Sequence, residues 1–107
     1  PELLKGTLQT IILQLLAKEG EMYGYEITQR VRDLSAGKIL ITEGALYPAL
    51  HKLVSDGMLV TRKEKFGKRV RKYYALTTEG RTSAATRVDA FRSFIETMFQ
   101  VLQLTPA

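Results

Sequence analysis

The last part of the chain carries an unbroken apolar repeat that few folds can accommodate. Its members are spaced 4-3-4-3-4 along the sequence and are Ala84, Val88, Phe91, Ile95, Met98 and Leu102. A 3.5-residue period is typical of a helix that packs along a second helix. A second row through Phe94 and Val101 makes this stripe wider than one contact surface requires. The sequence therefore predicts one long helix that begins at Thr77 or Thr78 and continues to about Gln103.

A helix of that length needs a second surface to cover it. At 1.5 Å per residue, about 26 helical residues extend about 39 Å. The roughly 80 residues before it would form a body about 30 Å across, so the helix should extend beyond its own domain. We predict that a second copy of the chain covers the exposed apolar end; the alternative is a helix folded over its own core. The predicted dimer contact consists of Val88, Phe91, Phe94, Ile95, Met98 and Leu102.

The composition is that of an ordinary globular domain. The 107 residues are 45% hydrophobic and 25% charged, which suits one compact domain and argues against a disordered chain. The absence of cysteine excludes disulfides, thiolate zinc sites, iron–sulfur clusters and a cysteine nucleophile. No apolar run approaches the roughly 18 to 20 residues of a membrane helix, and Pro1-Glu2 lacks the basic start of a signal peptide. We therefore expect a cytoplasmic protein with no membrane contact, metal or cofactor.

Two shorter helices and a short strand are expected in the first part of the chain. Apolar residues recur at steps of three and four over about Thr7–Lys18 and again over Tyr23–Leu34. The stretch Lys38–Ile41 is short and β-branched, so we expect a brief edge strand there.

A third helix is expected between Thr42, a plausible N-cap, and Gly57. Pro48 forfeits one helical hydrogen bond and is least harmful in a first turn. The regular helix is therefore expected to begin near Ala45 or Leu46, with its N-terminal end exposed.

The positive charge is concentrated in one segment. Between Arg62 and Lys72 lie seven bases and one acid, a local charge of +6, while the other nine bases and ten acids nearly cancel. The β-prone runs Leu59–Thr61 and Val70–Leu76 flank Phe66–Lys68 and predict a hairpin with its turn at Gly67. Few apolar residues alternate with the bases, so the hairpin should project into solvent.

The order of these elements favours a fold that is mainly α with a small β-hairpin. The second and third helices form a helix-turn-helix, and the basic hairpin forms a wing. We expect a winged helix-turn-helix DNA-binding domain over residues 1–77 and a dimerisation helix over residues 78–107, in one compact unit. A helix fits the major groove of B-DNA, and a basic hairpin can follow the phosphate backbone beside it.

Four segments of the chain resemble the PadR family of bacterial transcriptional regulators. These segments are Tyr23–Ile27, Gly44–Leu53, Gly57–Leu59 and Arg71–Thr77. The short C-terminal region resembles the smaller subfamily that includes the multidrug-responsive LmrR. This resemblance implies a dimeric winged-helix repressor that binds an inverted repeat in a promoter and is released by a small molecule or another signal. The LmrR type has a tryptophan in the last helix that stacks on flat drugs, whereas this sequence has no tryptophan.

The residues predicted to contact double-stranded DNA lie in three places. They are Thr42, Gly44, Tyr47 and Lys52 on the third helix, Lys65, Lys68, Arg69 and Arg71 on the wing, and Tyr23 and Gly24 at the start of the second helix. Packing against the hairpin is the alternative for Tyr47, and a core position is the alternative for Tyr23. Tyr73 and Tyr74 lie on opposite faces of a strand, so one should be core and the other a phosphate donor; the sequence leaves open which.

An effector site, if one exists, is expected between the first and last helices at the dimer centre. An apolar cavity there would take a small apolar or aromatic effector. Its predicted lining is Leu8, Ile12, Phe91, Phe94, Ile95 and Met98.

Other functions fit the residues less well. The sequence has no nucleophile elbow, phosphate-binding glycine loop or metal-ligand cluster, so we do not expect an enzyme. Two alternatives stay open at this point. One is a non-specific nucleic-acid binder that recognises shape and charge, and the other is a protein–protein adaptor that uses the C-terminal helix.

Overall fold

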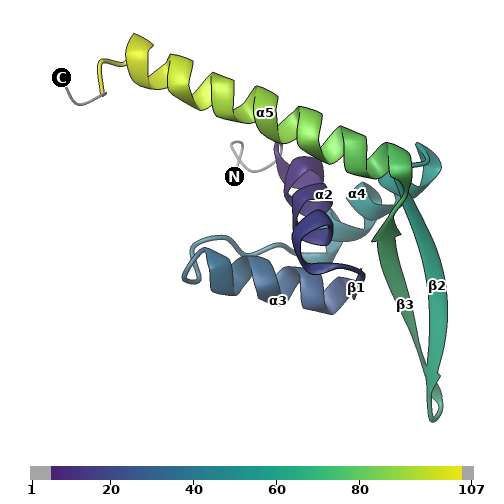
Figure 1. Ribbon diagram of the computed structural model, residues 1–107. Helices are drawn as coiled ribbons and strands as arrows, with labels where there is room; N and C mark the ends of the chain where they lie inside the picture. Colours follow the sequence, from purple (N-terminus) through teal and green to yellow (C-terminus); the bar gives the residue numbers. More distant parts are fainter. Residues whose placement is uncertain (1–5, 105–107) are drawn as a thin grey trace.

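A computed structural model describes residues 6–104, which form four helices and one three-stranded sheet (Figure 1). The elements are α2 (Leu8–Glu19), β1 (Met22–Tyr23), α3 (Gly24–Leu34), α4 (Glu43–Ser55), β2 (Leu59–Phe66), β3 (Arg69–Leu76) and α5 (Thr78–Val101). The predicted fold class is confirmed, with three short helices, a hairpin and a long last helix. Residues 1–5 and 105–107, which the predicted domain limits include, lie outside the described residues.

The core forms where one face of each short helix meets the base of the sheet. Most apolar residues of the predicted stripes on the three short helices are buried, because each stripe lies on a single helical face; Leu34, at the end of α3, is exposed. Tyr74 is 2% exposed, so it is the core member of the tyrosine pair, while Tyr73 is half-buried. The fully buried large side chains are Tyr74, Ile12, Leu13, Ile27, Leu46, Leu50, Leu53 and Leu59.

The sheet is antiparallel, with strand order β1-β3-β2. Leu59 pairs with Leu76 at the buried base, and Phe66 pairs with Arg69 at the exposed tip. Gly67 begins the two-residue turn with a φ of +61°, which glycine adopts without strain. Beyond its base the hairpin β2–β3, which we call the wing, projects away from the helices as predicted (Figure 1).

The prediction of an edge strand over Lys38–Ile41 is wrong. The third strand is Met22–Tyr23, which pairs with Tyr73 and Tyr74. Residues 38–41 instead form a loop. The Ile39 N–H donates to the Ser35 hydroxyl at 2.9 Å, so it is not available for a hydrogen bond to a neighbouring strand. The apolar Ile41 of this loop is buried in the core and holds the loop against it.

The predicted start of α4 near Ala45 or Leu46 is also too late. The helix begins at Glu43, where Thr42 caps it by accepting the Ala45 N–H at 3.2 Å. Pro48 therefore lies inside the helix, and the Gly44 carbonyl loses the donor that residue 48 would normally provide. Both residues are exposed, so water can bond to that carbonyl and the helix continues through the proline.

A hydrogen-bonded junction fixes the start of α5 to the loop between α4 and β2. The Thr77 hydroxyl donates to the Gly57 carbonyl at 2.6 Å and accepts the Gly80 N–H at 2.9 Å, which confirms Thr77 as the N-cap. The Thr77 N–H donates to the Met58 carbonyl at 3.0 Å. A Cβ on Gly80 would lie 2.0 Å from the Met58 carbonyl oxygen, so only glycine allows this approach.

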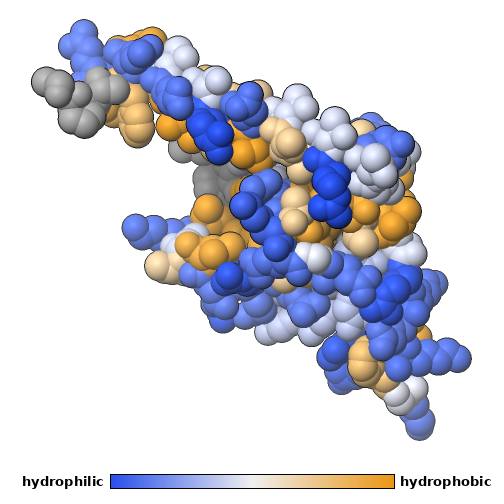
Figure 2. All heavy atoms as spheres, in the orientation of Figure 1, coloured by the Kyte–Doolittle hydropathy of each residue, from blue (hydrophilic) through white to orange (hydrophobic). Residues whose placement is uncertain are grey.

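The first half of α5 packs on α2, and the second half extends past it (Figure 1). Arg87 links the two helices through a hydrogen bond of 2.9 Å to the Gln9 side chain. The described residues extend 58 Å along their longest axis but only 30 and 21 Å along the others, and both the wing and the end of α5 project from the core (Figure 1). Figure 2 shows apolar side chains gathered along the lower side of this overhang. Its large exposed apolar residues are Phe91, Phe94, Ile95, Phe99, Val101 and Leu102.

Replacement of Gly80 by alanine tests the junction. Alanine normally stabilises a helix by about 1 kcal/mol relative to glycine. Here we expect Gly80→Ala to lower the free energy of unfolding by about 3 kcal/mol, because the methyl group would overlap the Met58 carbonyl. Urea unfolding followed by circular dichroism at one protein concentration measures the change.

Thr82→Ala, at an exposed position in the same helix, is the matched control and should change the free energy of unfolding by less than about 0.5 kcal/mol. A Gly80→Ala protein as stable as the wild type would contradict the tight contact.

Candidate nucleic-acid interface

The exposed face of α4 lies opposite its buried leucines. Leu46, Leu50 and Leu53 hold the helix against the core, which leaves the other face uncovered. The predicted contacts Thr42 and Lys52 are not buried, and Lys52 forms an exposed ion pair of 3.2 Å with Asp56. Such a surface pair is weak, so the ammonium group remains available to another anion. We call the surface of Glu43, Gly44, Tyr47, Pro48 and His51 the α4 face; all five are exposed.

Tyr47 packs on the first residue of α3. A Cβ on Gly24 would lie 2.6 Å from the Tyr47 hydroxyl oxygen and 3.0 Å from its ring, so the ring occupies the space that a side chain would need. The alternative prediction placed Tyr47 against the hairpin; its ring contacts Gly24 of α3, and its hydroxyl lies near that of Tyr74 on β3. Burial raises the pKa of the Tyr74 hydroxyl, and the nearby Tyr47 hydroxyl raises it further. Tyr47 therefore lies where α3, α4 and the sheet meet, with 37% of its surface exposed.

Tyr23 connects the start of α3 to the wing. Its backbone N–H donates to the Glu26 carboxylate at 3.1 Å, which closes the first turn of the helix. Its ring contacts the Tyr73 ring edge-on, with centroids 5.5 Å apart. The side chain is half-buried between these groups, while Gly24 is buried.

Arg62 is the one wing cation held by two carboxylates within residues 6–104. Its Nε donates to the Glu21 carboxylate at 2.9 and 3.0 Å, and its Nη1 donates to Glu64 at 2.8 Å. The hydrogen bonds from Arg62 hold the pKa of Glu21 below its usual value, and the two carboxylates raise the pKa of Arg62. The guanidinium also lies 4.4 Å from the Tyr73 ring centroid. The two carboxylates balance the charge of Arg62 and occupy its N–H donors, so Arg62 is not available to bind an external anion.

The other wing cations have no carboxylate within 4.0 Å in the part of the chain that the structure describes. Arg71 lies over two rings, 4.5 Å from the centroids of Tyr23 and of Phe66. The remaining exposed bases extend along both strands and the turn: Lys63, Lys65, Lys68, Arg69 and Lys72. Glu64 is the one acid of this segment and is paired with Arg62, so the other exposed bases keep their charge and attract a polyanion.

The arrangement of helix pair and wing matches a family of known proteins. The model of the transcriptional regulator PadR-like family matches residues 12–86, a span that contains α3, α4 and the whole wing. The chain belongs to this family. It has the winged-helix fold of PadR family members.

Two curated relatives support the assignment. The transcriptional regulator YqjI of Escherichia coli K12 is 32% identical over 75 residues, which are 70% of this chain and 34% of YqjI. The transcriptional regulator Rv3488 of Mycobacterium tuberculosis is 36% identical over 67 residues, which are 63% of this chain and 60% of Rv3488. The chain therefore spans about a third to three fifths of these relatives.

Solved structures are similar over more of the chain. A PadR family transcriptional regulator from Eggerthella lenta matches with a TM-score of 0.84 and 28% identity, over 97% of this chain and 88% of that one. Bacillus subtilis PadR in complex with operator DNA matches with a TM-score of 0.68 and 29% identity, over 76% of this chain and 46% of that one.

In the structure of this PadR-like chain, the residues predicted to line an effector site differ in burial. Leu8 and Ile12 are buried in the core of the protomer, whereas Phe91, Phe94 and Ile95 are exposed on the overhang. Val88 and Met98 are half-buried. A shallow depression of about 590 Å³ lies elsewhere, along Thr78, Glu79, Thr82, Ser83, Thr86 and Arg87 of α5. Within residues 6–104, no helix is long and apolar enough to cross a membrane.

Sequence reasoning did not find Glu21, the acidic partner of Arg62. The two residues are 41 positions apart and meet because β1 pairs with β3 beside β2. A local signal for this contact was absent, since a strand of two residues has too few positions to show alternation.

Proposed function

We propose that this PadR-like protein is a cytoplasmic homodimer that binds an inverted repeat in promoter DNA and represses transcription. The observation that carries the proposal is a wing whose exposed bases, apart from Arg62, have no acidic partner among residues 6–104, beside a helix with an uncovered polar face. The fold shared with B. subtilis PadR, a protein solved with operator DNA, supports DNA as the partner.

The α4 face would enter the major groove. Thr42 and Gly44 lie at the exposed N-terminal end of the helix, where a dipole and free N–H groups favour phosphate. Tyr47 would present its exposed edge to a phosphate or a thymine methyl group. Tyr23 and Gly24 at the start of α3 would follow the adjacent backbone, and Lys52 would approach a phosphate from the far end of α4.

The wing would supply the sequence-independent part of the affinity. Lys65, Lys68, Arg69 and Arg71 are the predicted phosphate or minor-groove contacts, and all four are exposed. Each phosphate neutralised releases counterions, so binding should depend steeply on salt.

The overhang of α5 would form the dimer contact. Phe91, Phe94 and Ile95 are 41%, 58% and 39% exposed, a large apolar surface for an isolated protomer. Val88, Met98 and Leu102 continue the same stripe, and a second copy would cover all six residues. In that dimer Leu8 and Ile12 of α2 would lie near the seam, where an apolar or aromatic effector could enter and release the protein from DNA.

The two open alternatives differ from this proposal in what they need. A non-specific binder needs the basic wing but no fixed distance between two α4 helices. An adaptor that uses α5 needs neither the α4 face nor unpaired bases on the wing. The combination of an uncovered α4 face, a basic wing and an apolar α5 favours the specific dimeric regulator.

Removal of charge from the wing tip tests the DNA contact. The double variant Lys68→Ala/Arg69→Ala should weaken binding to every duplex alike. It should also flatten the slope of log affinity against log salt by about 0.9 for each phosphate that the variant no longer neutralises. Fluorescence anisotropy with labelled duplex over a salt series measures both quantities.

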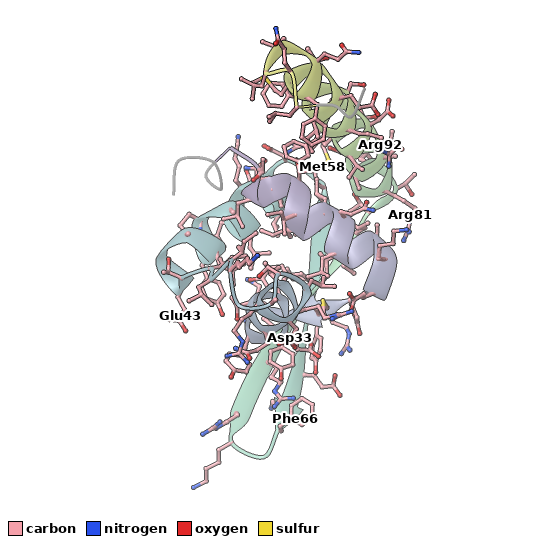
Figure 3. The ribbon with its side chains drawn as sticks, turned by 90° about the vertical axis from the view of Figure 1, so that its left-hand side faces the viewer. Asp33, Glu43, Met58, Phe66, Arg81 and Arg92 are labelled. Carbon is pink, nitrogen blue, oxygen red and sulfur yellow. The ribbon has the colours of Figure 1, made fainter. Side chains whose placement is uncertain are left out.

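Arg81→Ala/Arg92→Ala removes the same charge from α5, far from the wing tip, and is the matched control (Figure 3). For this control, the slope of log affinity against log salt should stay close to that of the wild type. An unchanged slope for the wing variant would remove the wing from the DNA contact.

A charge placed on the α5 stripe tests the dimer. Phe91→Glu and Ile95→Glu should each produce a folded monomer, because two carboxylates would face each other in an apolar seam. Sedimentation velocity measures the oligomeric state, and circular dichroism verifies that the variant is folded.

Ser93→Glu adds the same charge to an exposed polar position of α5 and should leave the dimer intact. If folded Phe91→Glu and Ile95→Glu proteins both sedimented as dimers, the seam would lie elsewhere.

A further inference from the structure

The two faces of the wing carry different cations. Residues paired across an antiparallel ladder point to the same face, and successive residues point to opposite faces. Arg62 pairs with Tyr73 and Glu64 pairs with Arg71, so these four residues share one face, which we call the arginine face. Lys63 pairs with Lys72 on the other face, which we call the lysine face; it also carries Lys65.

The arginine face is a continuous stack of guanidinium groups and rings. Arg71 lies 4.5 Å from the centroids of both Phe66 and Tyr23. Tyr23 contacts Tyr73 edge-on, and Arg62 lies 4.4 Å from the Tyr73 ring. The stack therefore extends from the tip of the wing to β1, the strand that leads directly into α3. A planar guanidinium suits such stacking better than an ammonium group does.

The lysine face lacks such internal partners near the tip. Lys63 and Lys65 are exposed, without a ring contact or a carboxylate partner among residues 6–104. Lys72 is exposed and lies 5.8 Å from the Tyr74 ring, at the outer limit of a cation–π contact. These ammonium groups remain free to exchange their counterions for phosphates.

The register also indicates which face is turned toward α4. Leu59 and Tyr74 belong to the lysine face, and at the base of the sheet both are buried against the helices. In Figure 3 Phe66, on the opposite face, lies on the side of the hairpin away from Glu43, the first residue of α4. A duplex that meets the α4 face would thus approach the wing from its lysine face.

We propose that the two faces have separate roles: Lys63, Lys65 and Lys72 contact the DNA backbone, while Arg71 braces the wing against α3 by stacking between Phe66 and Tyr23. Arg71 is thereby a positioning residue, in place of the direct phosphate contact predicted from the sequence. This inference rests on the proposed DNA-binding function.

Variants of the stack separate bracing from charge. Phe66→Leu changes no charge, and Arg71→Lys keeps the charge but removes the planar group. Both should speed amide hydrogen exchange in β2 and β3 of the free protein. Both should also weaken duplex binding by roughly three- to tenfold at every salt concentration, with an unchanged salt slope. Lys63→Gln/Lys72→Gln should leave amide hydrogen exchange in the wing unchanged. It should flatten the slope of log affinity against log salt by about 0.9 for each phosphate that loses its lysine contact.

Each other outcome counts against the inference. If Arg71→Lys bound like the wild type while Arg71→Gln flattened the slope, Arg71 would contact phosphate directly. If hydrogen exchange in the wing were unaffected by Phe66→Leu and Arg71→Lys, the brace would not exist. A wild-type protein that failed to bind any duplex at low salt would instead overturn the proposed function, and the exchange measurement would still test the brace.

Discussion

The arrangement of the molecule depends on the hydrogen-bonded junction around Thr77. This one side chain bonds to the Gly57 carbonyl at the end of α4 and accepts the Gly80 N–H at the start of α5. The approach is so close that residue 80 has no room for a Cβ. Because β3 ends and α5 begins at the same place, the junction sets how the helix pair and wing are oriented relative to the long helix.

A rigid junction has a direct consequence for the proposed function. The groups proposed to face DNA lie on α4 and the wing, whereas the apolar surface proposed to bind a second protomer lies on the far half of α5. Arg87 strengthens the connection by bonding α5 to Gln9 of α2. Two protomers joined through α5 would then hold two α4 faces at a defined distance. A shift at the seam would change that distance, which offers a physical route from an effector to release of DNA.

The sequence predicted the elements whose signals are local. Periodicity located the helices, Thr42 and Thr77 marked their starts, and Gly67 marked the turn. Two predictions failed for local reasons, the Ser35–Ile39 hydrogen bond and a helix that continues through Pro48. Other features were missed because distant segments decide them. The two-residue β1 forms only because β3 offers an open edge, and the Arg62–Glu21 pair exists only because β1 does. The choice between Tyr73 and Tyr74 as the core residue depended in the same way on which face of β3 the helices cover.

The most direct test of a fixed distance between two DNA-reading helices is selection of bound duplexes from a random pool, at two salt concentrations. The account predicts an inverted repeat whose half-sites are centred about one helical turn, roughly 10 base pairs, or a multiple of it, apart. Raised salt should weaken binding without changing that spacing. Enrichment of a single unpaired motif, or retention of DNA by charge with no motif, would contradict the account.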